Sequence, residues 1–219
     1  MKIWLSTLLS TFFFMYNTWT EIFYLQSLTY KDPKMSTEKI NQKDSYLKFS
    51  MALFLCLLIR LLPLRAPNVE PIMTGVMPMS KAYGALVGFI FAFLSIICYD
   101  LITGTLGVWS ILTSLSYGVI GLASALFFQN REATGKNFAI FAVGSTLFFD
   151  AVTGLLTGPL FFDQLFSVAL IGQIPFTLLH LVSNVAFAII LSPAIYKLLI
   201  KKKVTQEILT ITNLNHKVI

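Results

Sequence analysis

The most constraining feature of this sequence is a succession of long apolar runs separated by short polar breaks. A helix needs about 20 mostly apolar residues to cross the hydrocarbon core of a membrane. In this chain 56% of residues are apolar and only 12% are charged, which is about half the charged fraction usual in soluble domains. The sequence therefore predicts an integral membrane protein and argues against a soluble globular domain.

We expect the membrane domain, residues 46–200, to be all-α, because helices satisfy their own backbone hydrogen bonds in lipid. It is predicted to hold about six transmembrane helices in a single bundle. The second is short and contains Pro71 and Pro78, so we expect it barely to span the membrane. The expected spans cover residues 47–64, 69–80, 82–103, 108–129, 137–157 and 174–196.

The basic residues predict which helix ends face the cytoplasm. They gather in residues 31–48, in the loop with Arg131 and Lys136, and in the basic tail at residues 201–219. Basic residues favour the cytoplasmic side, and an even number of crossings between these segments places all of them there. The net charge of +6 follows from this topology, so no nucleic-acid partner is expected.

Residues 1–45 are predicted to form a separate segment. Its first part is apolar and aromatic but interrupted by Asn17 and Glu21, which favours an interfacial helix over a spanning one. Lys2 before an apolar stretch is typical of a signal peptide, yet no small-x-small cleavage site follows. Met35 opens a polar stretch and is a candidate start of the native chain.

The sequence lacks the motifs of catalytic and metal sites. Cys56 and Cys98 lie within apolar runs without metal-site spacing, so we expect buried thiols. No P-loop, dinucleotide-binding fingerprint, metalloprotease motif or hydrolase nucleophile elbow occurs. We therefore predict no enzyme activity, catalytic residue, metal or cofactor. Close helix packing, and not phosphate binding, is expected at Gly84, Gly88, Gly118 and Gly121.

Part of the sequence repeats at an offset of 50 residues. Residues 90–106 and 140–156 are identical at eight of seventeen positions, and both contain the pattern Asp-x-x-Thr-Gly. Both copies are expected to run from inside to outside, which is one arrangement of transporters that bind between related halves. The alternative is that the pattern only ends a helix at the membrane surface, with glycine as the stop.

Asp100 and Asp150 begin the two copies of this pattern, with Thr103 and Thr153 one turn further on. Ionisable groups at membrane depth are costly, so they usually face a cavity or a partner. The two carboxylates can bind a cation, relay protons or accept hydrogen bonds from a polar substrate. The alternative is that each is a solvated carboxylate at the membrane surface.

The segment after the first span contributes Asn68 and Glu70, held extended by neighbouring prolines. It is either a loop over a pocket or a connector with an Arg65–Glu70 ion pair. Trp109, with Tyr99 and Tyr117, can stack on a planar ligand or belong to an aromatic belt at the membrane surface.

The last span carries a polar stripe along one helical face. Such a stripe either joins helices through hydrogen bonds or lines a binding cavity. A lone histidine in it is more typical of packing than of metal binding. The stripe consists of Gln173, Thr177, His180 and Asn184.

This layout resembles the substrate-binding S components of energy-coupling factor (ECF) transporters, the vitamin-uptake systems of bacteria and archaea. The resemblance covers residues 47–200 and rests on the helix pattern, the two Asp-x-x-Thr-Gly copies and the segment Arg65-Ala66-Pro67-Asn68-Val69-Glu70-Pro71. It implies an S-component-like fold that captures a vitamin-like molecule from outside, in a pocket near the outer face. The candidate substrate-binding residues are Asn68, Glu70, Asp100, Thr103, Trp109, Asp150, Thr153, Gln173, His180 and Asn184.

The resemblance also implies partners and a location. Two cytoplasmic ATPases and a membrane coupling subunit perform the ATP-driven work in this family, and the S component topples in the bilayer to release its cargo. Ala52 and Cys56, one turn apart on the first span, are expected to meet the coupling subunit. The expected location is the plasma (inner) membrane of a bacterium or archaeon, with both ends of the six-helix domain cytoplasmic.

No substrate-specific motif for riboflavin, biotin, thiamin or folate is present. The acidic groups favour a ligand with amines or ring N–H donors. Two other functions remain open from the residues alone. One is an ion- or proton-coupled transporter that uses Asp100, Asp150 and His180, and the other is a membrane scaffold without a ligand.

Overall fold

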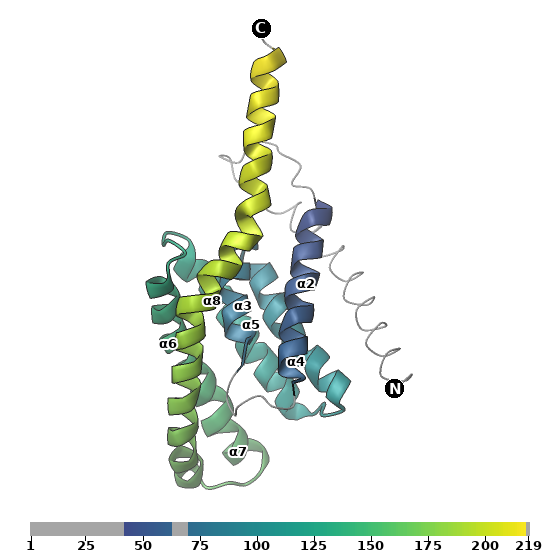
Figure 1. Cartoon of the computed structure of the whole chain (residues 1–219). Coiled ribbons are helices and arrows are strands. Elements are labelled where there is room, and N and C mark those ends of the chain that lie inside the picture. The colour runs from purple at the N-terminus through teal and green to yellow at the C-terminus, as the bar shows by residue number, and fades with distance from the viewer. Residues whose placement is uncertain (1–41, 63–69, 218–219) are drawn as a thin grey trace.

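The computed structural model describes the backbone of residues 42–62 and 70–217 and the side chains of residues 46–62 and 70–199. Within these ranges the chain is helical, without strands (Figure 1). Met35, Arg65 and Asn68 lie outside the described residues, as does nearly all of the predicted segment 1–45. The elements are α2 (Gln42–Arg60), α3 (Ile72–Tyr83), α4 (Ala85–Thr103), α5 (Val108–Phe128), α6 (Gly135–Asp150), a π-helical turn η1 (Ala151–Leu155), α7 (Leu156–Phe161) and α8 (Phe166–Lys217).

Four helical segments of the described chain are long and apolar enough to cross a membrane. Their surfaces fit a lipid environment, since Leu126, Ile171 and Val182 are 72%, 70% and 71% exposed. The described chain thus has the pattern of an all-α membrane protein, although six spans were expected and α2 and α3 fall outside these four. The four segments are Ala85–Thr103, Val108–Phe128, Gly135–Phe161 and Phe166–Leu199.

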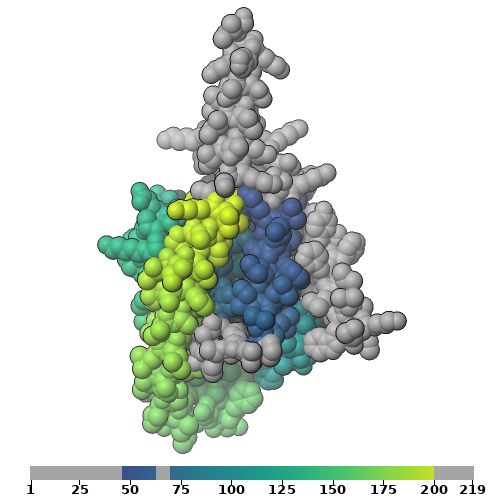
Figure 2. Space-filling model, viewed as in Figure 1, coloured from purple at the N-terminus to yellow at the C-terminus, as the bar shows by residue number. Residues whose placement is uncertain are grey.

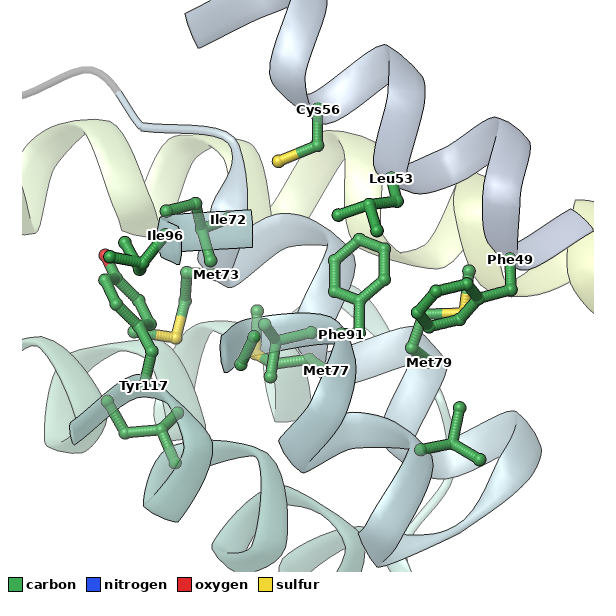
Figure 3. Packing of buried hydrophobic residues seen from close by; sticks show 14 of the residues in the cluster. Phe49, Leu53, Cys56, Ile72, Met73, Met77, Met79, Phe91, Ile96 and Tyr117 are labelled. Carbon is green, nitrogen blue, oxygen red and sulfur yellow. The ribbon is translucent and has the colours of Figure 1, made fainter. Parts of the chain in front are cut away.

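The short helix α3 lies at the centre of the bundle, packed by α2, α4, α5 and α8. Every residue from Ile72 to Ser80 is buried. Because protein and not lipid surrounds this helix, its 12 residues do not have to match the membrane thickness. Figure 3 shows Met73 of α3 beside Tyr117 of α5 in this core.

A proline inside α3 is compensated by a neighbouring helix. Pro78 has no backbone N–H, so it cannot make the usual helical hydrogen bond to the carbonyl of Thr74. The hydroxyl of Ser192 on α8 donates to that carbonyl at 3.1 Å instead. Ser192 is fully buried, so this bond holds α8 against α3 at a point that water does not reach.

Basic residues of separate helices meet at one end of the bundle. Lys48 near the start of α2 donates to the carbonyl of Leu199 on α8. Lys81 at the end of α3 donates to the carbonyls of Phe128 at 3.0 Å and Arg131 at 2.7 Å, where α5 ends. This common end agrees with the side that the sequence assigns to the cytoplasm.

The expected close packing of glycines occurs between α4 and α5. A Cβ atom on Gly121 would lie 2.5 Å from the carbonyl carbon and oxygen of Gly88. A Cβ on Gly118 would lie 2.5 Å from the ring of Phe89. Gly84 has a different role from the one expected, because its φ of 96° lets the chain turn from α3 into α4.

The last two spans are longer than the sequence indicated. Helix α6 passes through η1 directly into α7, which ends at Phe161 and not at residue 157. Helix α8 begins at Phe166, eight residues before the expected residue 174, and continues through the basic tail to Lys217. It runs beside α6 and forms one side of the bundle, as Figures 1 and 2 show.

The apolar core contains both cysteines. Cys56 on α2 is 5% exposed and Cys98 on α4 is 3% exposed, so both thiols are buried. Ala52 is partly buried against the same core, and Figure 3 places Cys56 on the α2 ribbon beside the core. Both residues thus pack within the bundle itself, and their contact with a coupling subunit stays a prediction.

Candidate functional site

The two Asp-x-x-Thr-Gly copies begin in the same way. The hydroxyl of Thr103 donates to the carbonyl of Tyr99 at 2.9 Å, and that of Thr153 donates to the carbonyl of Phe149 at 2.8 Å. Each threonine therefore bonds one turn back along its own helix. Both hydroxyl groups thus donate within their own helices.

The first copy ends helix α4. Gly104 adopts a left-handed conformation with φ of 72°, and the N–H of Thr105 bonds to the carbonyl of Asp100. The carboxylate of Asp100 accepts a hydrogen bond from the Thr105 hydroxyl at 3.5 Å. The expectation that this pattern is a helix stop is confirmed here.

The second copy does not end its helix. The chain continues from Asp150 into the π-helical turn η1 and then into α7, and Gly154 has no left-handed conformation. A Cβ on Gly154 would lie 1.9 Å from the side-chain oxygen of Gln173. This glycine therefore lets α8 approach η1 closely, and such single π-turns are frequent at functional sites.

Asp150 forms a buried pair with His180. Asp150 Oδ1 and His180 Nδ1 lie 2.8 Å apart, and the two side chains are 3% and 2% exposed. The rings of Phe149 and Phe176 stand edge-on to the imidazole at 5.8 and 5.7 Å between ring centres. The pair is thus enclosed by aromatic groups inside the bundle.

A second polar contact lies one turn further along the same two helices. The side-chain N–H of Asn184 on α8 donates to the hydroxyl of Thr146 on α6 at 2.9 Å. Toward the other end, Gln173 donates to Thr177 at 3.1 Å within α8. The predicted stripe thus does share one face, and the structure brings its last two residues against α6.

Several polar atoms of this face are left without partners. Among the described residues, Asp150 Oδ2, His180 Nε2 and Asn184 Oδ1 are buried and accept or donate no hydrogen bond. Buried polar groups in proteins are nearly always hydrogen-bonded. Three such atoms on two facing helices therefore mark a place where another molecule can supply the missing contacts.

Glu70 belongs to a second cluster, built around Arg60. The Arg60 guanidinium lies 3.5 Å from the Glu70 carboxylate, and the Tyr117 hydroxyl donates to Glu70 at 3.2 Å. Arg60 also donates to the carbonyl of Ser95 at 3.1 Å and lies 4.0 Å from the centre of the Tyr99 ring. The acid that the sequence assigned to an outer loop is thus held by α2 and α5.

The two clusters are joined by aromatic side chains. The rings of Tyr117 and Phe149 are 4.2 Å apart between centres, and Phe149 adjoins Asp150 in the sequence. Tyr117 is fully buried. These ring contacts connect the Glu70 cluster to the Asp150–His180 pair, whereas Asp100 contacts Thr105 at the end of α4.

Trp109 lies apart from these contacts. Its indole N–H donates to the carbonyl of Thr105 at 3.1 Å, and 47% of the residue is exposed. Together with Phe161 at the end of α7 and the following Phe162, it lines an apolar hollow of about 160 Å³. The exposed position fits an aromatic belt as well as a ligand mouth.

Sequence reasoning missed two members of the site. Thr146 lies one helical turn before Asp150, and this spacing, which places both side chains on one face of the helix, could have identified it as a site residue. No role was predicted for Arg60, because nothing in its spacing indicated a contact with Glu70. Among the described residues no group of three or more His, Cys, Asp and Glu side chains can hold a metal ion.

Comparisons of this chain with protein-family models, with curated proteins and with solved structures found no match.

Proposed function

We propose that this protein is the substrate-binding membrane subunit of an ECF-type uptake transporter. It captures a small vitamin-like molecule from the outer side and passes it to an ATP-driven coupling module. The observation that carries the proposal is the set of unpartnered buried atoms on Asp150, His180 and Asn184. They lie inside an apolar helical bundle, beside the cluster of Glu70 and Tyr117.

This arrangement has the composition of a small-molecule site. Tight sites are mostly apolar, with a few polar groups that fix the ligand's orientation. Here Phe149, Phe176 and Tyr117 supply apolar surface around the Asp150–His180 pair. A ligand that hydrogen-bonds the unpartnered atoms relieves the cost of burying them, and this relief favours binding of a matching molecule.

The direction of uptake rests on the ends of the bundle. The contacts of Lys48 and Lys81 gather basic groups at one end, which we assign to the cytoplasm. Trp109 lies at the start of α5, and the exposed Asp163 lies between α7 and α8. We assign both to the opposite side of the membrane. A ligand from outside therefore enters near Trp109 and the start of α8. Release inside requires the coupling subunit and the two ATPases, because this chain has no P-loop.

The direct test is to purify the protein in mild detergent and analyse its extract for a bound small molecule by mass spectrometry. A panel of vitamins is then screened for a rise in unfolding temperature. We expect one compound to co-purify in stoichiometric amount and to stabilise the protein. Asn184→Leu should weaken its binding at least tenfold. Asn137→Leu is the matched control, because Asn137 contacts the Glu132 carbonyl near the other end of α6.

If no compound co-purifies and none in the panel stabilises the protein, the proposal is wrong. A scaffold role then becomes the better explanation. In that case substitutions at Asn184 would reduce stability without changing the affinity for any ligand.

A proton- or ion-coupled transporter is the second candidate, and the buried Asp150–His180 pair favours it. Such pairs of ionisable groups in membranes often relay protons. Reconstituted protein would then show a pH-dependent flux that is lost when Asp100 and Asp150 are both replaced with asparagine. Flux that persists in this double variant excludes the relay.

A further inference from the structure

The Arg60–Glu70 cluster and the Asp150–His180 pair differ in how their charges are compensated. Arg60 and Glu70 lie 3.5 Å apart and compensate each other. Asp100 lies at the end of α4, where Thr105 donates to it. Asp150 has only His180 as a described ionisable partner. Among the described residues, the Asp150–His180 pair is therefore electrically neutral only when one positive charge joins it.

A proton on His180 is one way to supply this charge. An ionised carboxylate only accepts hydrogen bonds, so His180 Nδ1 carries the hydrogen of the 2.8 Å contact. If His180 Nε2 is also protonated, its N–H is a charged donor without a described partner. If Nε2 is not protonated, the pair keeps a buried negative charge, which is costly in an apolar interior. Neither state satisfies both atoms of the pair.

The second way is a ligand that carries the charge itself. A cationic nitrogen group donates to Asp150 Oδ2 and, with His180 neutral, also to His180 Nε2. Both atoms are unpartnered among the described residues, as is the acceptor Asn184 Oδ1. The other unpartnered buried side-chain atoms are Arg60 Nε and the hydroxyls of Thr74 and Ser124.

We infer that the Asp150–His180 pair selects a ligand with a cationic nitrogen group, such as an amidine, that donates to Asp150 Oδ2 and His180 Nε2. This inference rests on the proposed binding function and specifies its substrate class. The rings of Phe149 and Phe176, edge-on to the imidazole, supply apolar surface beside these atoms.

The charged groups around the pair are consistent with a cationic ligand. From α5, Tyr117 reaches toward it and bonds Glu70, which Arg60 neutralises. From α3, which also packs against α8, the described charged side chain is Lys81, whose contacts lie at the opposite end of the bundle. No described cation therefore occupies the position that the ligand would take.

The structure also offers an approach from outside. The hollow at Trp109 lies eight residues before Tyr117 on α5, which is about 12 Å at the rise of an α-helix. Thr157, also in its lining, lies seven residues after Asp150, or about 10 Å along the chain. The cation would pass inward from this hollow between α5 and η1.

The test uses three probes of equal shape: benzamidine, which is cationic, benzamide, which is neutral, and benzoate, which is anionic. Binding to the purified full chain is measured by calorimetry. We expect benzamidine to bind at least tenfold more tightly than benzamide, and benzoate not to bind.

Two variants separate the roles of the two side chains. Asp150→Asn should abolish the preference for benzamidine, because it removes the charge. His180→Gln keeps a hydrogen-bonding side chain and leaves the Asp150 carboxylate in place, so benzamidine should still bind more tightly than benzamide. Asp163→Asn is the matched control, since Asp163 is exposed and its φ of 51° suits asparagine; it should behave as the native protein.

The inference is overturned if benzamidine and benzamide bind equally. It is also overturned if Asp150→Asn keeps the preference for benzamidine. These results differ from a failure of the proposed function. An anionic or neutral vitamin that co-purifies with the protein would support uptake and refute the cationic substrate class.

Discussion

Ser192 supplies to α3 the hydrogen bond that Pro78 cannot make, so the two residues should be energetically coupled. The Thr74 carbonyl accepts from the Ser192 hydroxyl at 3.1 Å in a fully buried position. Ser192→Ala leaves this carbonyl without a partner, which costs about 1–3 kcal/mol in a buried site. In a Pro78→Ala background, the new N–H at residue 78 bonds to the same carbonyl. The cost of Ser192→Ala should then fall to about 0.5 kcal/mol or less.

The measurement is a double-mutant cycle of unfolding free energies in mild detergent. Ser116→Ala is the control, because the Ser116 hydroxyl donates to the carbonyl of Leu112 in its own helix, where the backbone N–H already bonds. It should be nearly neutral in both backgrounds. A coupling energy between Ser192 and Pro78 within about 0.5 kcal/mol of zero, the range found for independent sites, would refute the reasoning.

Two further predictions concern the packing of α4 against α5 and the Arg60–Glu70 ion pair. Gly121→Ala should destabilise the protein by about 1–3 kcal/mol, because its Cβ would lie 2.5 Å from backbone atoms of the facing helix. Thermal unfolding tests this, with Gly144→Ala as the control, because a Cβ on Gly144 meets open space. Equal stabilities of the two variants would contradict the prediction. Arg60→Leu should cost about 1–3 kcal/mol by removing a charged partner of the half-buried Glu70, and the double variant with Glu70→Leu should recover part of this loss in denaturant unfolding. Equal loss in the single and double variants would show that the pair itself does not matter.

The sequence was sufficient to predict the features that depend on periodicity alone. The apolar runs of α4 and α5 lie within three residues of their expected bounds, because lipid demands long uninterrupted apolar helices. The stripe from Gln173 to Asn184 lies on one face of α8 as its spacing predicted, and its two innermost residues are buried. Burial of both cysteines was also predicted correctly.

Features that depend on tertiary contacts were not predictable. The central burial of α3 arises from the four helices around it, and its own 12 residues indicate only a short span. The contact of Arg60 with Glu70 joins the end of α2 to the residue two before α3, and the spacing of these two residues did not indicate it. The π-helical turn after Asp150 has no local sequence signal that we can identify.

The two Asp-x-x-Thr-Gly copies show how neighbouring helices decide the role of a repeated pattern. In the first copy nothing lies within 4 Å of a Cβ built on Gly104, so the residue is free to turn left-handed and end α4. In the second copy Gln173 packs on Gly154, and α8 supplies His180 to Asp150. The same five-residue pattern therefore gives a helix end in one half and a buried, charged site in the other. Because α8 packs against α6 and η1 and not against α4 in this way, any ligand recognition should depend far more on Asp150 than on Asp100.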